Sequence, residues 1–268
     1  MFCLTRVTND NDSLESMTHP RNVGWGEIGL DYHYDNSPRD VQTEVFTRQL
    51  RHAVRLGKPI TVHTREADED TESILKAEVP KDHKVQQWFF SLVSYGARPH
   101  GSRAHGSSTT PQIHIHCFTD SPEFGQRLLD HFPNLYIGIT GMLSFFPPFR
   151  LPYEHNQSRR IRELMFCFFL EGVITFSSNE NTSHLVRRMF ATASQSSPPR
   201  VILETDAPFM IPANIYGSLP TVKGRLPLCH TAMIPWTAEV VAAVAGEGWD
   251  VDGVLELGKT NAHNVYGI

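Results

Sequence analysis

Histidine and carboxylate side chains stand near the C-terminal ends of four short apolar stretches that have the pattern of β-strands. Because side chains alternate across a strand, the residues able to bind a metal share one face of each stretch, while the other face is mostly Ile, Val and Leu. The residues sharing a face are Glu27 with Asp31, His63 with Arg65, His114 with His116, and Glu204 with Asp206. Imidazole and carboxylate groups are ligands for Mg, Mn or Zn. Four such strands predict a barrel whose parallel strands converge on one metal site.

The segments between these strands have helical spacing of apolar residues. After the Glu27 strand, Ser37 and Pro38 mark a helix start, and the helical pattern continues to Gly57, which is a plausible stop. Further helices are expected over 66–76, over 124–132 and twice within 235–268, and further strands over 135–139 and 201–205. A strand that is followed repeatedly by a helix predicts a parallel sheet and an α/β fold.

Composition sets limits on partners and compartment. The 268 residues are 40% hydrophobic and carry a formal net charge of -5, so no global basic field attracts nucleic acid or anionic lipid, and any nucleic-acid contact must be local. The four cysteines are scattered without a Cys-x-x-Cys pair, which argues against a disulfide framework and favours a reducing compartment, cytoplasmic or nuclear. The most apolar run, 164–170, is far shorter than the roughly 20 residues that span a bilayer, so no membrane partner is expected.

Two segments interrupt the alternation of strands and helices. Residues 85–112 include a Gly- and Ser-rich stretch typical of linkers, and residues 142–172 are rich in aromatic side chains. We interpret both as insertions into a single barrel domain that covers 1–268, with an irregular segment over 1–22. We expect the insertions to be translated introns or other gene-model errors, which sequencing of the transcript tests.

The motifs resemble one known family. The chain is similar to the TatD-type metal-dependent deoxyribonucleases, members of the amidohydrolase-like TIM barrels, and looks closest to fungal ones. The matching motifs lie at 26–31, 59–65, 116–119, 136–141, 204–208 and 261–267. The resemblance covers 23–84, 113–141 and 173–268, and together these motifs are highly specific.

The resemblance implies a role for each site residue. Glu27 would bridge two divalent cations, His63 and His116 would bind one of them, and Asp206 would bind the other and take the proton of the attacking water. The catalytic pair is then Asp206 and Glu27, with up to two Mg, Mn or Zn ions as cofactors. A metal pair lowers the pKa of a bound water and holds the oxygens of a phosphodiester in line.

Other charged residues are candidates for contact with substrate. By the same resemblance, Arg65 and Glu204 would support the ligands or face the phosphate. Lys223 and Arg225 follow the Asp206 strand, in a loop expected at the site end of the barrel. Asp31 is a candidate for substrate contact, although a turn or a helix cap at this strand end is an equally good interpretation.

The N-terminal region departs from the family pattern. Family members open with a strand carrying a metal-binding His-x-His pair, whereas residues 1–22 contain only His19. The expected fold is therefore an incomplete TIM-type (β/α) barrel that lacks the first one or two β/α units. Glu27, His63 and His116 could still hold one cation, and the other site would keep only Glu27 and Asp206.

Three functional hypotheses follow. The first is a metal-dependent hydrolase of DNA phosphodiesters, most simply a 3′-5′ exonuclease acting on single-stranded ends through a metal-activated water. The second is an inactive or metal-poor fragment or pseudoenzyme of the same fold. The third is a small amide or ester hydrolase of the superfamily, which usually adds a ligating Lys on a middle strand, and no such Lys is found in this sequence.

Overall fold

The computed structural model describes residues 14–17, 19, 21–81, 112–141, 180–219, 221, 224 and 226–267. The predicted insertion 142–172 lies outside these residues, as does 85–112 except for Gln112. Most of the segment 1–22, predicted to be irregular, also lies outside them.

The described strands form one five-stranded sheet in the order β1-β2-β3-β4-β5. The strands are β1 (Trp25–Asp31), β2 (Ile60–Arg65), β3 (Ile113–Ile115), β4 (Leu135–Ile139) and β5 (Val201–Leu203). The helices are α2 (Arg39–Leu56), α3 (Asp68–Glu78), α4 (Pro122–His131), α6 (Asn181–Ala191), α7 (Ile215–Ser218), the 3-10 helix η1 (Thr231–Met233), α8 (Ile234–Ala245) and α9 (Val251–Tyr266). Strands are parallel and sequential strands are neighbours, which confirms the predicted α/β class.

The chain divides into two compact units. One unit comprises Met1–His114, Leu129–Leu135 and Ala262–Ile268, and the other comprises Ile115–Leu128 and Tyr136–Asn261. We call them the first and the second unit, and each is described by itself.

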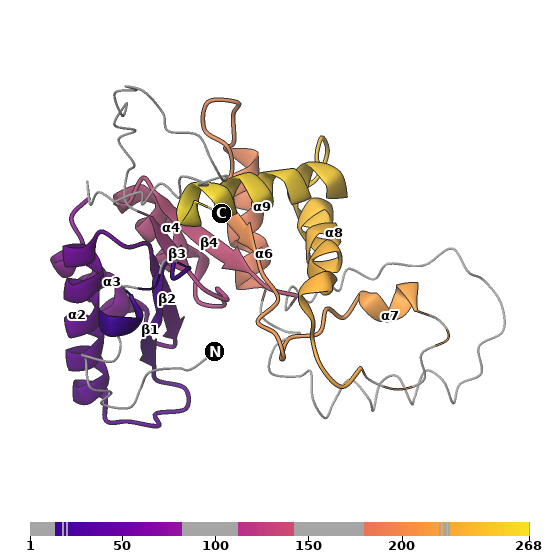
Figure 1. The fold of residues 1–268 in the computed structure, drawn as a ribbon. Helices are drawn as coiled ribbons and strands as arrows, with labels where there is room; N and C mark the ends of the chain where they lie inside the picture. Colours follow the sequence, from indigo (N-terminus) through magenta and orange to yellow (C-terminus); the bar gives the residue numbers. More distant parts are fainter. Residues whose placement is uncertain are drawn as a thin grey trace, which may run out of the picture. The chain divides into compact units, whose positions relative to one another are not determined.

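In the first unit, α2 holds the C-terminal end of β1 in place (Figure 1). The buried Gln42 of α2 accepts a hydrogen bond from the Asp31 N–H at 2.9 Å and donates to the carbonyls of Asp31 and Ser37. At the other end of the strand, the indole of Trp25 donates to Gln49 at 2.8 Å. The helix therefore sets the position of both ends of β1.

The predicted boundaries of α2 are confirmed. Pro38 precedes its first residue, and Gly57 ends it in the left-handed conformation with φ of 57°. Glycine is favoured there because it lacks the Cβ that penalises this conformation. By contrast, α3 begins at Asp68 and not at the predicted 66, because Glu66 has φ of 54° and cannot continue into a right-handed helix.

The two glycines of β1 permit a close approach to β2. A Cβ atom added to Gly29 would lie 1.8 Å from the carbonyl oxygen of His63, and one added to Gly26 would lie 2.6 Å from that of Thr61. Both glycines also have φ near +155°, at 153° and 156°, which disfavours other residues. The sequence Gly26-Glu27-Ile28-Gly29 is thus required to place Glu27 against β2.

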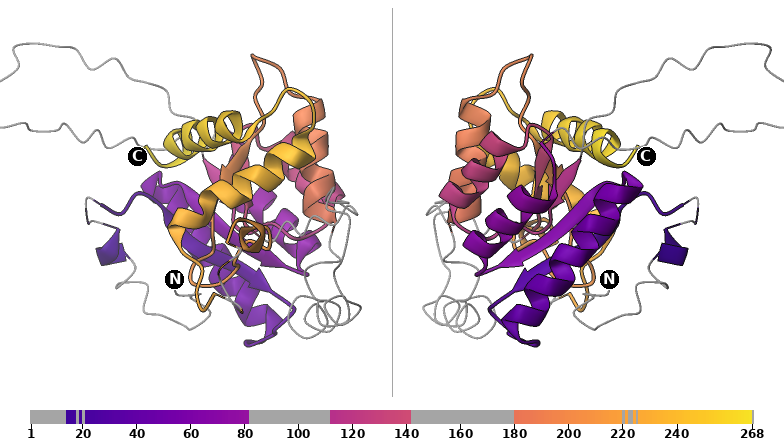
Figure 2. Two further views of the ribbon diagram at one scale, coloured as in Figure 1. Left: turned by 90° about the vertical axis from the view of Figure 1, so that its right-hand side faces the viewer. Right: turned by 90° about the vertical axis from the view of Figure 1, so that its left-hand side faces the viewer.

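In the second unit, helices position the segments that follow β3 and precede β5 (Figure 2). The hydroxyl of Thr182, in the first turn of α6, donates to the carbonyl of Phe118 at 2.7 Å. Asn261 of α9 donates to the carbonyls of Pro199 and Val201 at 2.9 and 2.8 Å. Ser121 caps the start of α4, because its Oγ accepts the Phe124 N–H at 3.3 Å.

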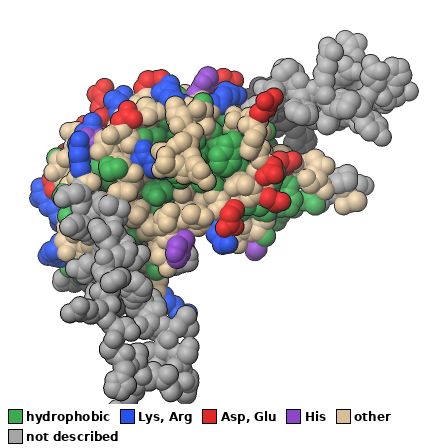
Figure 3. Space-filling model, turned by 90° about the horizontal axis from the view of Figure 1, so that it is seen from above, with side chains coloured by type: hydrophobic (Ala, Val, Ile, Leu, Met, Phe, Trp, Pro, Cys, Tyr) green, Lys and Arg blue, Asp and Glu red, His purple; other side chains and the backbone are tan. Residues whose placement is uncertain are grey.

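The described surface carries both basic and acidic side chains, as Figure 3 shows for one face. This agrees with the modest net charge of -5. Among the described helices, none has the length and apolar character needed to cross a membrane.

Candidate metal site

A first group of metal-ligand side chains forms where β1 and β2 run side by side in the first unit. His63 Nδ1 lies 2.9 Å from Glu27 Oε1, and His63 Nε2 lies 3.4 Å from Asp31 Oδ2. Gly29 pairs with His63 in the register of the two strands, which places Glu27 and Asp31 on either side of the imidazole. The structure therefore brings together Glu27, His63 and Asp31, as the alternation of side chains predicts.

The carboxylates dominate the electrostatics of this group. Burial lowers the pKa of His63, but the neighbouring carboxylates of Asp31 and Glu27 outweigh burial and raise this pKa to about 9. Burial likewise opposes ionisation of Asp31, yet His63 and the backbone N–H groups of Tyr34 and His33 hold the Asp31 pKa below its usual value. The surroundings of His63 therefore favour a positive charge on its imidazole.

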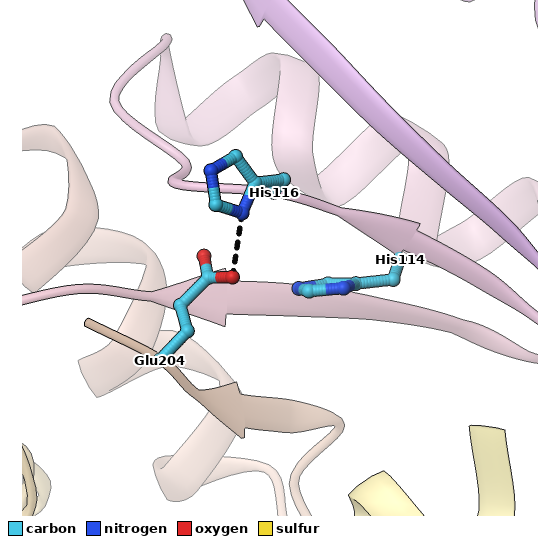
Figure 4. A group of neighbouring side chains, drawn as sticks. All are labelled: His114, His116 and Glu204. Carbon is cyan, nitrogen blue, oxygen red and sulfur yellow. Dashed lines mark hydrogen bonds and ion pairs between the residues drawn. The ribbon is translucent and has the colours of Figure 1, made fainter. Parts of the chain in front are cut away.

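A second group forms in the second unit around His116 (Figure 4). His116 Nδ1 lies 2.6 Å from Glu204 Oε2, and His116 Nε2 lies 3.4 Å from Asp206 Oδ1. The other oxygen of Glu204 accepts the backbone N–H of Cys117. An ionised carboxylate only accepts hydrogen bonds, so Nδ1 must carry the proton and the lone pair of a neutral His116 is on Nε2, beside Asp206.

His114, the remaining histidine of this strand, has a different environment. Potential ligand atoms of His114, His116 and Glu204 all lie within 4.8 Å of one another. However, His114 Nδ1 is hydrogen-bonded to the Tyr266 hydroxyl at 2.7 Å, and the same hydroxyl contacts Thr61 Oγ1 at 2.8 Å. His114 thus anchors the end of α9 to the sheet.

Two of the site strands end earlier than the sequence pattern predicts. β3 ends at Ile115 and β5 ends at Leu203, so His116, Glu204 and Asp206 stand in the turns that follow. Cys117 and Asp206 have positive φ angles of 47° and 50°, a conformation that interrupts the strand and redirects the side chains. Cys117 is half-buried, and its Sγ contacts Thr140 Oγ1.

The donor chemistry of both groups fits a divalent cation. Nε2 of His63 is buried without a hydrogen-bond partner among the described residues, and a cation ligated there would satisfy it. In the second group, Glu204 orients His116 as a carboxylate does in many carboxylate–histidine–metal sites. Imidazole and carboxylate donors suit Mg, Mn or Zn.

Of the other predicted site residues, the structure describes Arg65 and Asp31. The Arg65 guanidinium lies over the ring of Tyr34, 4.9 Å from its centroid. Asp31 Oδ1 accepts the backbone N–H groups of His33 and Tyr34, so the predicted turn role is present, in addition to its position beside His63. Lys223 and Arg225 lie outside the described residues.

Sequence reasoning missed Gln42 and Tyr34. Gln42 supports Asp31 from the buried face of α2, and a polar residue among apolar ones on a helix face was the available signal. Tyr34 is exposed beside Arg65, and its position in the sequence carried no signal of its own.

A parallel α/β sheet that carries histidine and carboxylate groups at its strand ends is the architecture of metal-dependent hydrolases. The family model of the TatD related DNases matches residues 5–148, more than half of the chain. The chain belongs to this family.

Curated relatives support the same assignment. The chain is 31% identical to the human 3'-5' RNA nuclease TATDN2 over 213 residues, which cover 79% of this chain and 19% of that protein. It is 34% identical to an uncharacterized metal-dependent hydrolase of Bacillus subtilis, over 49% of this chain and 40% of the relative. The identity to the 3'-5' ssDNA/RNA exonuclease TatD of Escherichia coli is 24%, over 95% of this chain and 70% of that enzyme. The chain thus spans less than half of the first two relatives.

Solved structures share the fold. A hydrolase of the TatD family from Entamoeba histolytica superposes with a TM-score of 0.59 at 13% identity, over 98% of this chain and 70% of that one. An uncharacterized amidohydrolase from Saccharomyces cerevisiae gives a TM-score of 0.56 at 18% identity, over 95% and 68%. The TatD-type barrel class is therefore confirmed, while the absence of its first β/α units stays a prediction.

Proposed function

We propose that this protein is a metal-dependent phosphodiesterase that removes nucleotides from the 3′ end of single-stranded nucleic acid. The observation that carries the proposal is the position of His63 and His116. Each imidazole lies between two carboxylates, and each histidine lies near the end of a strand. Family membership supports it, as do relatives named as 3'-5' nucleases of RNA or single-stranded DNA.

Each residue has a defined part in the proposed reaction. Glu27 and His63 would hold a cation in the first group, and His116 Nε2 and Asp206 would hold one in the second. When bound, divalent cations supply Lewis acidity that activates water and stabilises charge on the phosphate. Asp206, close to His116 and partly exposed, accepts the proton of the attacking water, and Glu204 holds His116 in the tautomer that leaves Nε2 available.

The number and identity of the cations belong to the proposal. With the residues described above, we propose one or two Mg, Mn or Zn ions per chain. Elemental analysis of the purified protein, before and after dialysis with each cation, measures this stoichiometry. Given the scattered cysteines, we place the protein in the cytoplasm or nucleus.

The decisive experiment is digestion of a 5′-labelled single-stranded oligonucleotide, as DNA and as RNA, in Mg or Mn. We expect stepwise shortening from the 3′ end that chelator abolishes and that His63→Ala, His116→Ala and Asp206→Ala each reduce by at least about 100-fold. His184→Ala, on the exposed face of α6, is the matched control and should retain full activity.

Failure of the experiment also identifies the alternatives. A protein that binds cations but degrades neither DNA nor RNA would contradict the nuclease proposal and favour the small amide or ester hydrolase. A folded protein that binds no cation would favour the pseudoenzyme.

A further inference from the structure

An exposed aromatic ring stands in the turn directly after β1. Tyr34 is 60% exposed, which makes it one of the most exposed large hydrophobic side chains among the described residues. Within the described part of the chain its hydroxyl makes no hydrogen bond. A large ring open to solvent is available for contact with a planar ligand.

The backbone of Tyr34 is fixed by a residue of the first metal-ligand group. Asp31 Oδ1 accepts the N–H groups of both His33 and Tyr34 at 3.0 Å, while Asp31 Oδ2 lies 3.4 Å from His63 Nε2. One carboxylate therefore connects the turn to the imidazole. These hydrogen bonds fix the turn that carries Tyr34 next to the first metal-ligand group, which we propose acts on the phosphate.

The surroundings of the Tyr34 ring include a cation and a second aromatic ring. The Arg65 guanidinium, at the end of β2, lies 4.9 Å from the Tyr34 ring centroid. The His33 ring meets the Tyr34 ring edge-on at 4.9 Å, and its Nδ1 is held by Glu66 at 2.7 Å. An aromatic face next to a guanidinium is the combination with which proteins bind the base and the phosphate of a single-stranded nucleotide.

The neighbouring Tyr32 has a different environment from Tyr34. Its hydroxyl donates to Asp70 at 2.6 Å, and the Arg39 guanidinium lies 4.3 Å from its ring centroid. Burial and the Asp70 carboxylate raise the pKa of Tyr32 to about 12. The hydroxyl of Tyr32 is thus engaged within the protein, whereas the hydroxyl of Tyr34 makes no hydrogen bond among the described residues and Tyr34 as a whole is 60% exposed.

We propose that Tyr34 stacks on a nucleobase near the 3′ end of a single-stranded nucleic acid, and that Arg65 contacts the adjacent phosphate. This inference rests on the proposed function, because it supplies the substrate contact that places the terminal phosphodiester. Stacking on an aromatic ring does not distinguish the four bases. We therefore expect binding of a single-stranded end to depend on its length and little on its sequence.

The test compares two oligonucleotides of equal length, one unmodified and one whose last 3′ nucleotides are abasic. Binding of each 5′-fluorescein strand is measured by anisotropy in Ca²⁺. We expect Tyr34→Ala to weaken binding of the unmodified strand about 5- to 150-fold and to leave binding of the abasic strand unchanged. Tyr34→Phe, which keeps the ring, should bind both strands as the unmodified protein does.

Arg65→Gln provides the complementary result. Because both strands carry the same phosphates, this substitution should weaken both by the same factor and reduce the salt dependence of binding. Equal weakening of the two strands by Tyr34→Ala, or no weakening of either, would overturn the stacking proposal. An unchanged thermal midpoint of Tyr34→Ala is expected, since the ring is exposed.

The outcome is separable from that of the proposed function. If the protein does not hydrolyse nucleic acid, the anisotropy comparison still measures stacking. If it hydrolyses both strands and Tyr34→Ala slows neither, the catalytic proposal stands and the stacking proposal fails.

Discussion

Glu204 accepts a hydrogen bond from Nδ1 of His116 at 2.6 Å, and the same carboxylate accepts the backbone N–H of Cys117. This pair of contacts determines which nitrogen of His116 can bind a cation. Glu204 itself precedes Asp206 by two residues, so the short segment after β5 supplies both the residue that orients the imidazole and the carboxylate that lies 3.4 Å from its Nε2.

Replacement of Glu204 by Gln should therefore weaken cation binding without unfolding the protein. The amide is nearly the same size, but it no longer provides a charged acceptor for Nδ1–H, and we expect metal affinity to fall about 10- to 100-fold. Isothermal titration with Mn²⁺ measures the change. Glu247→Gln, on an exposed residue after α8, is the control, and an equal loss in both variants would contradict the orienting role of Glu204.

Replacement of Gly29 by Ala should destabilise the protein strongly. The new Cβ would lie 1.8 Å from the His63 carbonyl oxygen, so β1 must move away from β2, at a cost of about 3 kcal/mol or more. Urea denaturation gives the free energy of unfolding. Gly217→Ala, whose Cβ would have no neighbour within 4 Å, should change stability little, and similar values for the two variants would show that the close approach of the strands is not required.

Replacement of Gln42 by Ala should leave backbone groups of Asp31 and Ser37 without their partner. Buried polar groups that lose a hydrogen bond cost about 1–3 kcal/mol, so the free energy of unfolding should fall by an amount in that range. Glu44→Ala, on the exposed face of the same helix, controls for helix propensity. A Gln42→Ala protein as stable as this control would refute the role of Gln42 at the end of β1.

After cations are removed, the contacts of His63 with Glu27 and Asp31 should make the stability of the protein depend on pH. Its folded pKa of about 9 lies above the ordinary value of 6.5, so its contribution in chelator-treated protein is fully present below pH 6.5 and is lost as pH rises through 9. Thermal unfolding midpoints between pH 6 and 10 measure this loss. His63→Asn should remove the pH-dependent component, and an identical profile in that variant would exclude His63 as its source.

The sequence alone predicted the elements whose boundaries depend on local chemistry. Pro38 and Gly57 bracket α2 because proline favours a first helical turn and glycine tolerates the left-handed conformation at its end. Alternation along β1 and β2 placed Glu27, Asp31 and His63 on common faces, since the two-residue period of a strand is a local property. The side chains able to bind a metal, and the family motifs that contain them, could also be recognised in the sequence because they too are local features.

Tertiary structure decided what each side chain contacts. Alternation could not show that β3 and β5 stop before His116 and Glu204, or that Cys117 and Asp206 take left-handed backbone conformations, because these depend on contacts with segments distant in sequence. Only the folded chain assigns Glu204 to His116, 88 residues away, and leaves the ring of Tyr34 in solvent. Residue types and the spacing of apolar residues can be read from the sequence, whereas the hydrogen-bond partner of a carboxylate depends on how segments distant in sequence pack together.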